Sequence, residues 1–214
     1  MENQKEFRAG LHDFGAAAGP DPESAQFAVV IPLVRRGGET YVLFEKRAED
    51  LDRQPGEICL PGGAEEDGEG LAQTAVRETS EELLIRPEQV RLLGRMKTLR
   101  TGYGNEIAVF LGELEDYRGT WSADEVACTF EVPLHYFLEN EPAEYGTAAR
   151  IEPDPDFPLD KIPGGANYPW HARRERVAFY YYEDWVIWGL TARIMKEAVR
   201  VLRAVPEAAQ AAGC

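Results

Sequence analysis

The sequence predicts an α/β protein built around a mixed β-sheet, and three observations lead to this prediction. Short apolar and β-branched segments are separated by turns rich in glycine and proline, which is typical of strands. The segment 70–84 has apolar residues at helical spacing and contains no internal proline or glycine. A second long amphipathic segment, 186–205, follows the last predicted strand. Because strands both precede and follow the helix 70–84, we expect parallel and antiparallel pairs in the same sheet.

The first predicted unit is a β-hairpin. Its strands are 25–34 and 41–47, and the glycine pair Gly37-Gly38 lies in the turn between them. A loop over 48–62 follows, and its Pro-Gly dipeptides enclose a short extended stretch at 57–60. This order predicts a hairpin that leads through a constrained loop into the central helix.

The central helix is predicted over 70–84, with Leu71, Ala75 and Leu83 facing inward. We expect Pro87 to end it, because proline cannot continue a helix. Further strands are predicted at 91–100, 105–115 and 126–134, with turns at 102–104 and 118–124.

The C-terminal third begins with a proline-rich segment, 139–169, which we interpret as a long surface loop. A strand at 176–185 and a helix at 186–205 follow, and the apolar stripe of that helix is expected in the core. The stripe consists of Ile187, Leu190, Ile194, Ala198 and Val201. The nearby tyrosines and tryptophans favour core packing and a subunit interface over stacking on a base.

Length and composition predict one domain over 26–205, with an N-terminal arm at 1–25 and a C-terminal tail at 206–214. The formal charge of −15 disfavours nucleic acid and anionic membranes as partners. Three cysteines without paired spacing indicate neither a disulfide framework nor a structural zinc site. With no export signal or membrane-spanning stretch in the sequence, we expect a cytoplasmic protein.

Three carboxylates lie close together on the predicted central helix: Glu78, Glu81 and Glu82. Such a cluster is either an ordinary solvated face or a set of ligands for a hard divalent cation. The Pro61-Gly62-Gly63 turn and the nearby helix start favour a ligand, because they offer backbone groups to an anion.

The residues from Gly63 to Ile85 resemble the Nudix box, whose pattern is G-x5-E-x7-R-E-U-x-E-E-x-G-U with U aliphatic. The matching polar and glycine positions are Gly63, Glu69, Arg77, Glu78, Glu81 and Glu82. Thr79 stands at an aliphatic position, where we expect its hydroxyl to bond back to the preceding turn. Leu84 replaces the last glycine, which usually ends the helix in a left-handed conformation, so we expect a different ending here.

This resemblance implies the Nudix fold, a mixed β-sheet sandwiched between helices, and hydrolysis of a nucleoside diphosphate linked to another moiety with Mg²⁺ or Mn²⁺. It implies that Glu78 and Glu82 are metal ligands, with the Gly63 carbonyl completing the set. Glu81 is then a further ligand or activates the attacking water, while Arg77 and Glu69 orient the carboxylates. Glu125 is a candidate extra acid, although an exposed residue at a strand entry is the alternative.

The stretch 43–63 resembles the coenzyme A pyrophosphatase branch of that family, with the pattern L-L-T-x-R-[SA]-x3-R-x3-G-x3-F-P-G-G. Arg47, Gly56 and the Pro-Gly-Gly turn align, whereas Glu45 and Asp52 stand at Thr and Arg positions. This resemblance implies cleavage of coenzyme A or its thioesters to 3′,5′-ADP and 4′-phosphopantetheine, with Arg47 and Arg53 binding substrate and Arg47 on the 3′-phosphate. The alternatives are a Nudix hydrolase of ADP-ribose or another nucleotide-sugar, and a non-catalytic domain that senses nucleotides.

Overall fold

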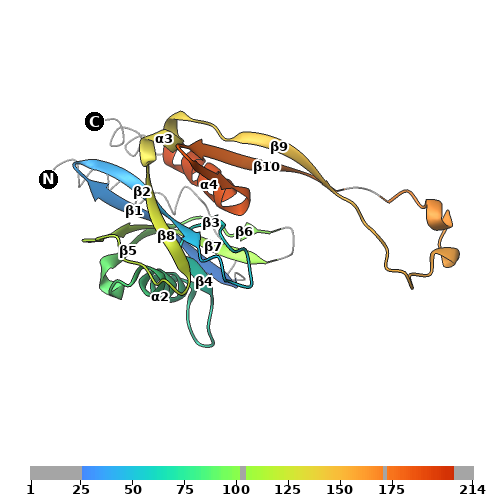
Figure 1. Cartoon of the computed structure of the whole chain (residues 1–214), viewed down its shortest axis with the longest axis horizontal. Coiled ribbons are helices and arrows are strands. Elements are labelled where there is room, and N and C mark those ends of the chain that lie inside the picture. The colour runs from blue at the N-terminus through green and yellow to red at the C-terminus, as the bar shows by residue number, and fades with distance from the viewer. Residues whose placement is uncertain (1–25, 102–104, 171–172, 205–214) are drawn as a thin grey trace.

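The computed structural model describes residues 26–101, 105–170 and 173–204. It contains a large β-sheet covered by helices and a smaller three-stranded sheet beside it (Figure 1). The predicted arm at 1–25, the turn at 102–104 and the tail at 206–214 lie outside the described residues, and the domain boundaries stay a prediction.

The large sheet is mixed, as predicted. Its central order is β3-β2-β1-β7-β5, where β1 is Phe27–Arg36, β2 is Glu39–Arg47, β3 is Ile58–Cys59, β5 is Val90–Arg95 and β7 is Glu106–Leu114. Strands β1 and β7 run parallel, and the other pairs in the sheet are antiparallel. Three strands pair outside this path: β4 (Gly62–Ala64) with β1, β6 (Leu99–Arg100) with β7, and β8 (Val126–Pro133) with β2. The predicted β1–β2 hairpin is confirmed, and Gly37 and Gly38 both have positive φ in its turn.

Side chains alternate between the two faces of this sheet. On β1, Ala28 and Val30 pack with Ala75 of helix α2 (Leu71–Leu83), whereas Ile31 and Leu33 pack with helix α4 (Gly189–Ala204). The same alternation on β2 directs Leu43 towards α2 and Phe44 towards α4. Helix α2 thus covers one face, and α4 with the smaller sheet covers the other.

Helix α2 confirms the predicted helix, but two details differ from expectation. The hydroxyl of Thr79 has no hydrogen-bond partner among the described residues, and it is Ser80 that donates to the Val76 carbonyl. Leu84 adopts the left-handed conformation itself, with φ 51° and ψ 48°, so the helix ends as a glycine would end it. Pro87 instead begins a short 3₁₀ helix, η1 (Pro87–Gln89).

The C-terminal third corrects the prediction in several places. The proline-rich segment contains strand β9 (Ala143–Ala149), which pairs with β10 (Arg173–Tyr182), and 3₁₀ turns η2 (Leu159–Lys161) and η3 (Gly165–Asn167). Strand β11 (Trp185–Trp188) occupies the start of the predicted helix, and a short helix α3 (Leu134–Glu139) follows β8. Ile187 is therefore a buried strand residue, and Leu190 is exposed. The β9–β10 pair extends away from the body, with residues 150–170 at its far end (Figure 1).

No helix within the described ranges is long and apolar enough to cross a membrane.

Candidate functional site

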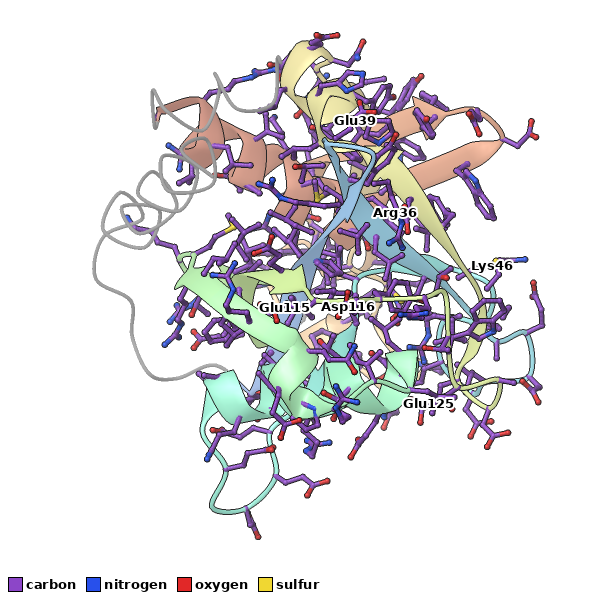
Figure 2. The ribbon with its side chains drawn as sticks, turned by 90° about the vertical axis from the view of Figure 1, so that its left-hand side faces the viewer. Arg36, Glu39, Lys46, Glu115, Asp116 and Glu125 are labelled. Carbon is purple, nitrogen blue, oxygen red and sulfur yellow. The ribbon has the colours of Figure 1, made fainter. Side chains whose placement is uncertain are left out.

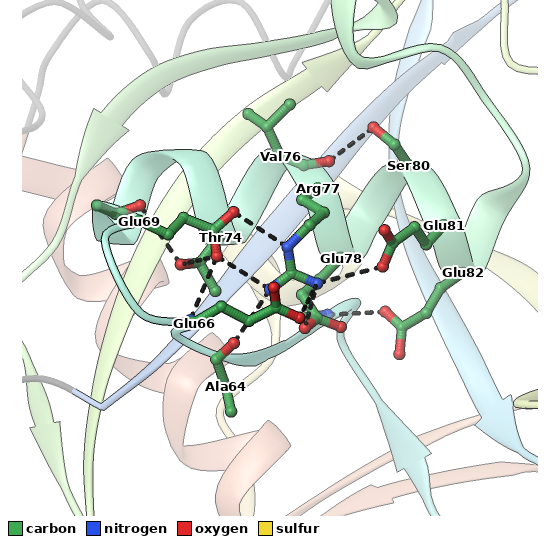
Figure 3. A network of polar contacts seen from close by, with 12 residues as sticks. Ala64, Glu66, Glu69, Thr74, Val76, Arg77, Glu78, Ser80, Glu81 and Glu82 are labelled. Atoms are coloured by element: carbon green, nitrogen blue, oxygen red, sulfur yellow. Dashed lines mark hydrogen bonds and ion pairs between the residues drawn. The ribbon is translucent and has the colours of Figure 1, made fainter.

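One guanidinium, that of Arg77, contacts two carboxylates of α2 and a third that precedes the helix (Figure 3). Arg77 binds Glu69 through two hydrogen bonds, from Nε to Oε1 and from Nη2 to Oε2, each of 3.0 Å. Its Nη1 donates to Glu78 Oε1 at 2.9 Å and to Glu81 Oε2 at 3.2 Å, and its Nη2 also donates to the Ala64 carbonyl. These contacts lower the pKa of Glu69 and raise that of Arg77, mainly through the hydrogen bonds between the two. Arg77 therefore ties the start of α2 and strand β4 to Glu78 and Glu81.

The Pro61-Gly62-Gly63 turn packs directly against two of these carboxylates. The Gly62 N–H donates to Glu82 Oε2 at 2.8 Å. A Cβ atom at Gly63 would lie 2.3 Å from the Glu78 carboxyl carbon, so only glycine leaves room for that carboxylate. A Cβ atom at Gly62 would lie 2.2 Å from the Ala28 carbonyl oxygen, so this glycine allows the close approach of β4 to β1.

The three helix carboxylates differ in their surroundings. Glu82 is 5% exposed, and burial raises its pKa to about 8, with the charges of Glu78 and Glu125 adding to the effect. Burial also raises the pKa of Glu78, although Arg77 opposes that shift. Glu81 lies at the surface, with a side chain 60% exposed. Burial therefore excludes an ordinary solvated position for Glu82, whereas the exposure of Glu81 is compatible with either interpretation.

The loop before β8 is held against the end of α2. The Ser122 N–H donates to the Glu82 carbonyl at 2.7 Å, and the Thr120 hydroxyl donates to the Leu83 carbonyl at 2.6 Å. These bonds satisfy carbonyls that the end of a helix leaves free. They also bring Glu125, labelled in Figure 2, within electrostatic range of Glu78 and Glu82. Glu125 is exposed at the entry of β8, and its role as an extra acid stays a prediction.

Arg47 and Arg53 come from the loop side of β2. Arg47 is half-buried, its Nε donates to the Arg53 carbonyl at 3.3 Å, and its charge lowers the pKa of Glu82. Lys46, the residue before Arg47, pairs with Glu49. Arg53 is exposed. Of the two predicted substrate-binding arginines, only Arg47 is brought to the carboxylates by a described interaction.

Sequence reasoning missed one residue of this site. Glu45 on β2 is fully buried, and the charges of Glu82 and Glu125 raise its pKa further above the value set by burial. In the sequence, Glu45 was noted only because it occupies a position where the coenzyme A pyrophosphatase pattern has threonine. The signal that could have found it was an acid directly after the apolar run 41–44, at a position that shares a face with Leu43.

These residues fit a hard divalent cation by their chemistry. Carboxylates and a backbone carbonyl are the oxygen donors that Mg²⁺ prefers. Within the described residues no three His, Cys, Asp or Glu side chains converge on one point, since Arg77 binds Glu78 and Glu81 and the Gly62 N–H binds Glu82. The Gly63 backbone nevertheless lies directly against the Glu78 carboxylate, and the negative charges that help to raise the pKa of Glu82 are ones that a cation would compensate.

A hollow of about 650 Å³ opens on the outer side of α2. It reaches the site through Glu69, Arg77 and Glu81, while the rest of its lining includes Val76, Ile85 and Leu92. Glu78 and Glu82 do not line it. The hollow is therefore beside the carboxylate cluster and not at its centre.

Comparisons with known proteins point to one family. The NUDIX domain model matches residues 25–150. The peroxisomal coenzyme A diphosphatase NUDT7 of Mus musculus is 37% identical over 118 residues, which cover 54% of this chain and 50% of that protein. The chain thus matches half the length of that relative.

Two further comparisons cover more of the chain. An uncharacterized Nudix hydrolase, NudL of Enterobacter sp. (strain 638), is 32% identical over 174 residues, or 80% of each chain. The crystal structure of a MutT/nudix family protein from Enterococcus faecalis superposes with a TM-score of 0.51 at 14% identity, covering 91% of this chain and 70% of that one. At this identity the superposition supports the fold alone.

Proposed function

This chain belongs to the Nudix hydrolase family, and from that premise we propose that it hydrolyses the diphosphate bond of coenzyme A or its thioesters, releasing 3′,5′-ADP and 4′-phosphopantetheine. Nudix hydrolases act on small-molecule nucleotides with divalent cations. The observation that carries the proposal is that the Glu78 and Glu82 carboxylates contact the Gly62-Gly63 turn. The similarity of this chain to a coenzyme A diphosphatase supports the choice of substrate.

Glu78 and Glu82 would hold the cation, together with Glu81 and the Gly63 carbonyl. When bound, the cation would neutralise the diphosphate oxygens and lower the pKa of a water molecule bound to it. Glu81 has the exposure that a ligand or base needs when it must meet both solvent and substrate. Arg77 and Glu69 are positioning residues, because their paired hydrogen bonds fix the guanidinium that contacts Glu78 and Glu81.

Arg47 is proposed to bind the diphosphate. From the sequence we expected it on the 3′-phosphate, but its charge acts on Glu82, the residue proposed to hold the cation. The planar guanidinium of arginine binds phosphate oxygens through paired hydrogen bonds, so Arg47 beside the proposed cation site suits the diphosphate. Arg53, which is exposed beside it, is left as the candidate for the 3′-phosphate.

A second candidate function is hydrolysis of ADP-ribose or another nucleotide-sugar. It is favoured by Glu45, because a buried acid stands where the coenzyme A pattern has threonine. A non-catalytic sensor is disfavoured, because all three helix carboxylates of the box are present. A cytoplasmic location and a homodimer stay predictions.

The test is a substrate panel. The purified chain is incubated with coenzyme A, acetyl-coenzyme A, ADP-ribose and a nucleotide-sugar, each with Mg²⁺ or Mn²⁺ and with excess EDTA, and the products are separated by chromatography. We expect 3′,5′-ADP from coenzyme A at the highest rate and none in EDTA. Faster turnover of ADP-ribose would select the second candidate, and no turnover of any compound would reject both.

A further inference from the structure

Glu45 is a charged residue in the interior of the large sheet. It lies on β2 between β3 and β8, where its register partners are Cys59 and Thr129. Its exposure is 0%, and among the described residues its Oε1 atom has no hydrogen-bond partner. Its neighbours on the strand, Leu43 and Phe44, are apolar and equally buried.

The alternation of β2 directs Glu45 to the face that α2 covers. Leu43, two residues earlier, packs with Leu83 of α2, so Glu45 points to the same side of the sheet. Glu82 precedes Leu83 and is also buried. The Glu82 charge raises the pKa of Glu45, in addition to the larger effect of burial, which agrees with this placement because two buried carboxylates repel.

The groups around Glu45 do not compensate its charge. The Cys59 thiol lies 4.0 Å from its Oε2, which is at most a weak hydrogen bond. Glu82 and Glu125 add negative charge, and Arg47 is the cation that opposes them. Arg47, however, is only half-buried, and its Nε is used by the Arg53 carbonyl.

A carboxylate without a partner in a sheet interior destabilises the fold, and an apolar residue at the same position would pack without that cost. An unpartnered carboxylate aimed at a buried ligand set is the arrangement expected where a cation provides the missing partner. The carboxylates of Glu45, Glu82 and Glu125 belong to β2, α2 and the loop before β8, respectively. They are close enough for the charges of Glu82 and Glu125 to act on Glu45, although they come from three different elements.

We propose that Glu45 is an additional ligand of the divalent cation, reaching it from the sheet side through the Oε1 atom that has no protein partner. This inference rests on the proposed function, because it concerns the same cation site. It adds a fourth carboxylate to the three on α2 and gives the site a ligand that is already buried and held by strand pairing. A ligand held in this way needs little ordering when the cation binds.

The experiment measures Mn²⁺ binding directly, from the electron paramagnetic resonance signal of free Mn²⁺ during titration. The parent chain, Glu45→Gln and the control Glu131→Gln are compared. Glu131 lies on the adjacent strand β8 and pairs with Arg36, so its substitution removes a carboxylate of the same sheet outside the site. Thermal unfolding of each protein is recorded without metal and with saturating Mn²⁺.

We expect Glu45→Gln to raise the dissociation constant for Mn²⁺ at least tenfold and Glu131→Gln to leave it within twofold of the parent. Without metal, Glu45→Gln should unfold at the same or a higher temperature than the parent, because it removes a buried charge. With Mn²⁺ it should gain less stability than the parent gains. A merely structural role for Glu45 would instead lower the metal-free unfolding temperature and leave Mn²⁺ affinity unchanged.

Two further outcomes separate this inference from the proposed function. If the parent binds Mn²⁺ and hydrolyses coenzyme A while Glu45→Gln binds Mn²⁺ equally well, Glu45 is not a ligand and the proposed function stands. If the parent binds no Mn²⁺ and hydrolyses nothing, the proposed function itself fails. Should Glu45→Gln not fold, Glu45→Asp replaces it: the charge is kept but withdrawn by one methylene, and an unchanged affinity would overturn the proposal.

Discussion

Alanine substitutions at Gly62 and Gly63 should separate the scaffold of the site from its chemistry. The two glycines are adjacent on β4, and the substitution adds the same methyl group at each. What that methyl group meets differs: at Gly62 it meets the backbone of β1, and at Gly63 it meets the end of the Glu78 side chain. The pair is therefore a matched comparison in which the obstructing group and the backbone conformation differ, since φ is positive at Gly62 but not at Gly63.

For Gly63→Ala we expect a small loss of stability and a large loss of function. The Glu78 carboxyl carbon, 2.3 Å from the new Cβ, must move by about 1 Å to reach ordinary van der Waals contact. An off-rotamer Glu78 costs about 0.5–1.5 kcal/mol, and the reduced entropy of the unfolded chain offsets about 0.4–1 kcal/mol of that. The net destabilisation is about 1 kcal/mol or less, while Mn²⁺ affinity should fall at least tenfold because one ligand is displaced.

For Gly62→Ala the obstacle cannot rotate away. The new Cβ would lie 2.2 Å from the Ala28 carbonyl oxygen and 2.6 Å from the Val29 Cα atom, and φ is 147°. Strand β4 must withdraw from β1, which breaks the bond from the Val30 N–H to the Pro61 carbonyl and the bond from the Gly62 N–H to Glu82. Because the pKa of Glu82 is about 8, its carboxyl group is mostly protonated in the metal-free chain at neutral pH, so each of the two bonds contributes about 1 kcal/mol. With about 1–3 kcal/mol for backbone strain, we expect a loss of about 4 kcal/mol.

Urea unfolding of the metal-free proteins measures both stabilities, and Mn²⁺ titration measures the ligand effect. Equal stability losses in the two variants would refute the distinction between backbone and side-chain obstruction. Parental Mn²⁺ affinity in a folded Gly63→Ala protein would refute the role of Glu78 as a ligand.

Three further predictions concern the charged groups of the site. The pKa of Glu82 is raised to about 8, so between about pH 5 and 8 the folded metal-free chain binds a proton there that the unfolded chain has released. The free energy of unfolding should therefore fall as pH rises from about 5 to 8. Urea unfolding measures this dependence, and Glu82→Gln should flatten it. Arg77→Lys should preserve folding but lower kcat/KM at least tenfold, because an ammonium cannot make the paired contacts with Glu69 while binding Glu78; a parental rate would show that the guanidinium only stabilises the fold. Arg47→Ala should raise KM for coenzyme A and for 3′-dephospho-coenzyme A by similar factors, and a loss confined to coenzyme A would return Arg47 to the 3′-phosphate.

The strands of the first hairpin and the central helix could be predicted because their signals are local. The β-branched residues of β1, the glycine pair after it and the apolar spacing of α2 act within a few residues of one another. Strand β9 could not be predicted in this way. Its sequence, AEYGTAA, has little strand propensity, and it is a strand because β10 pairs with it along residues 143–149.

The boundary between β11 and α4 shows a different limit. The apolar run from Val186 to Trp188 is compatible with either a strand or a helix. Pairing with β10 selects the strand, and Gly189, with φ 62°, changes the direction of the chain before the helix begins. Leu84 was unpredictable for a related reason: its left-handed conformation is accepted because the Leu84 and Ile85 N–H groups satisfy carbonyls at the end of α2.

The residues of the site also differ in whether local sequence or long-range pairing brings them together. The box residues share one helix and the turn before it, so their proximity follows from sequence spacing. Glu45 and Glu125 reach the site through sheet register and through the loop bonded to the end of α2, which depend on residues far away in the chain. Their electrostatic coupling to Glu82 could be seen only after folding had brought them together.

The balance of charge explains why the folded chain should respond to a cation. On the surface side of the carboxylate cluster, Arg77 compensates negative charge by binding Glu69, Glu78 and Glu81. On the buried side, formed by Glu45 and Glu82, the partly exposed Arg47 is the cation that opposes the negative charge within the part of the chain that the structure describes. Uncompensated carboxylates in the interior favour protonation or a bound cation, and near neutral pH a divalent cation compensates two of them at once. Cation binding and folding stability are therefore expected to be linked more strongly through the buried pair than through the exposed Glu81.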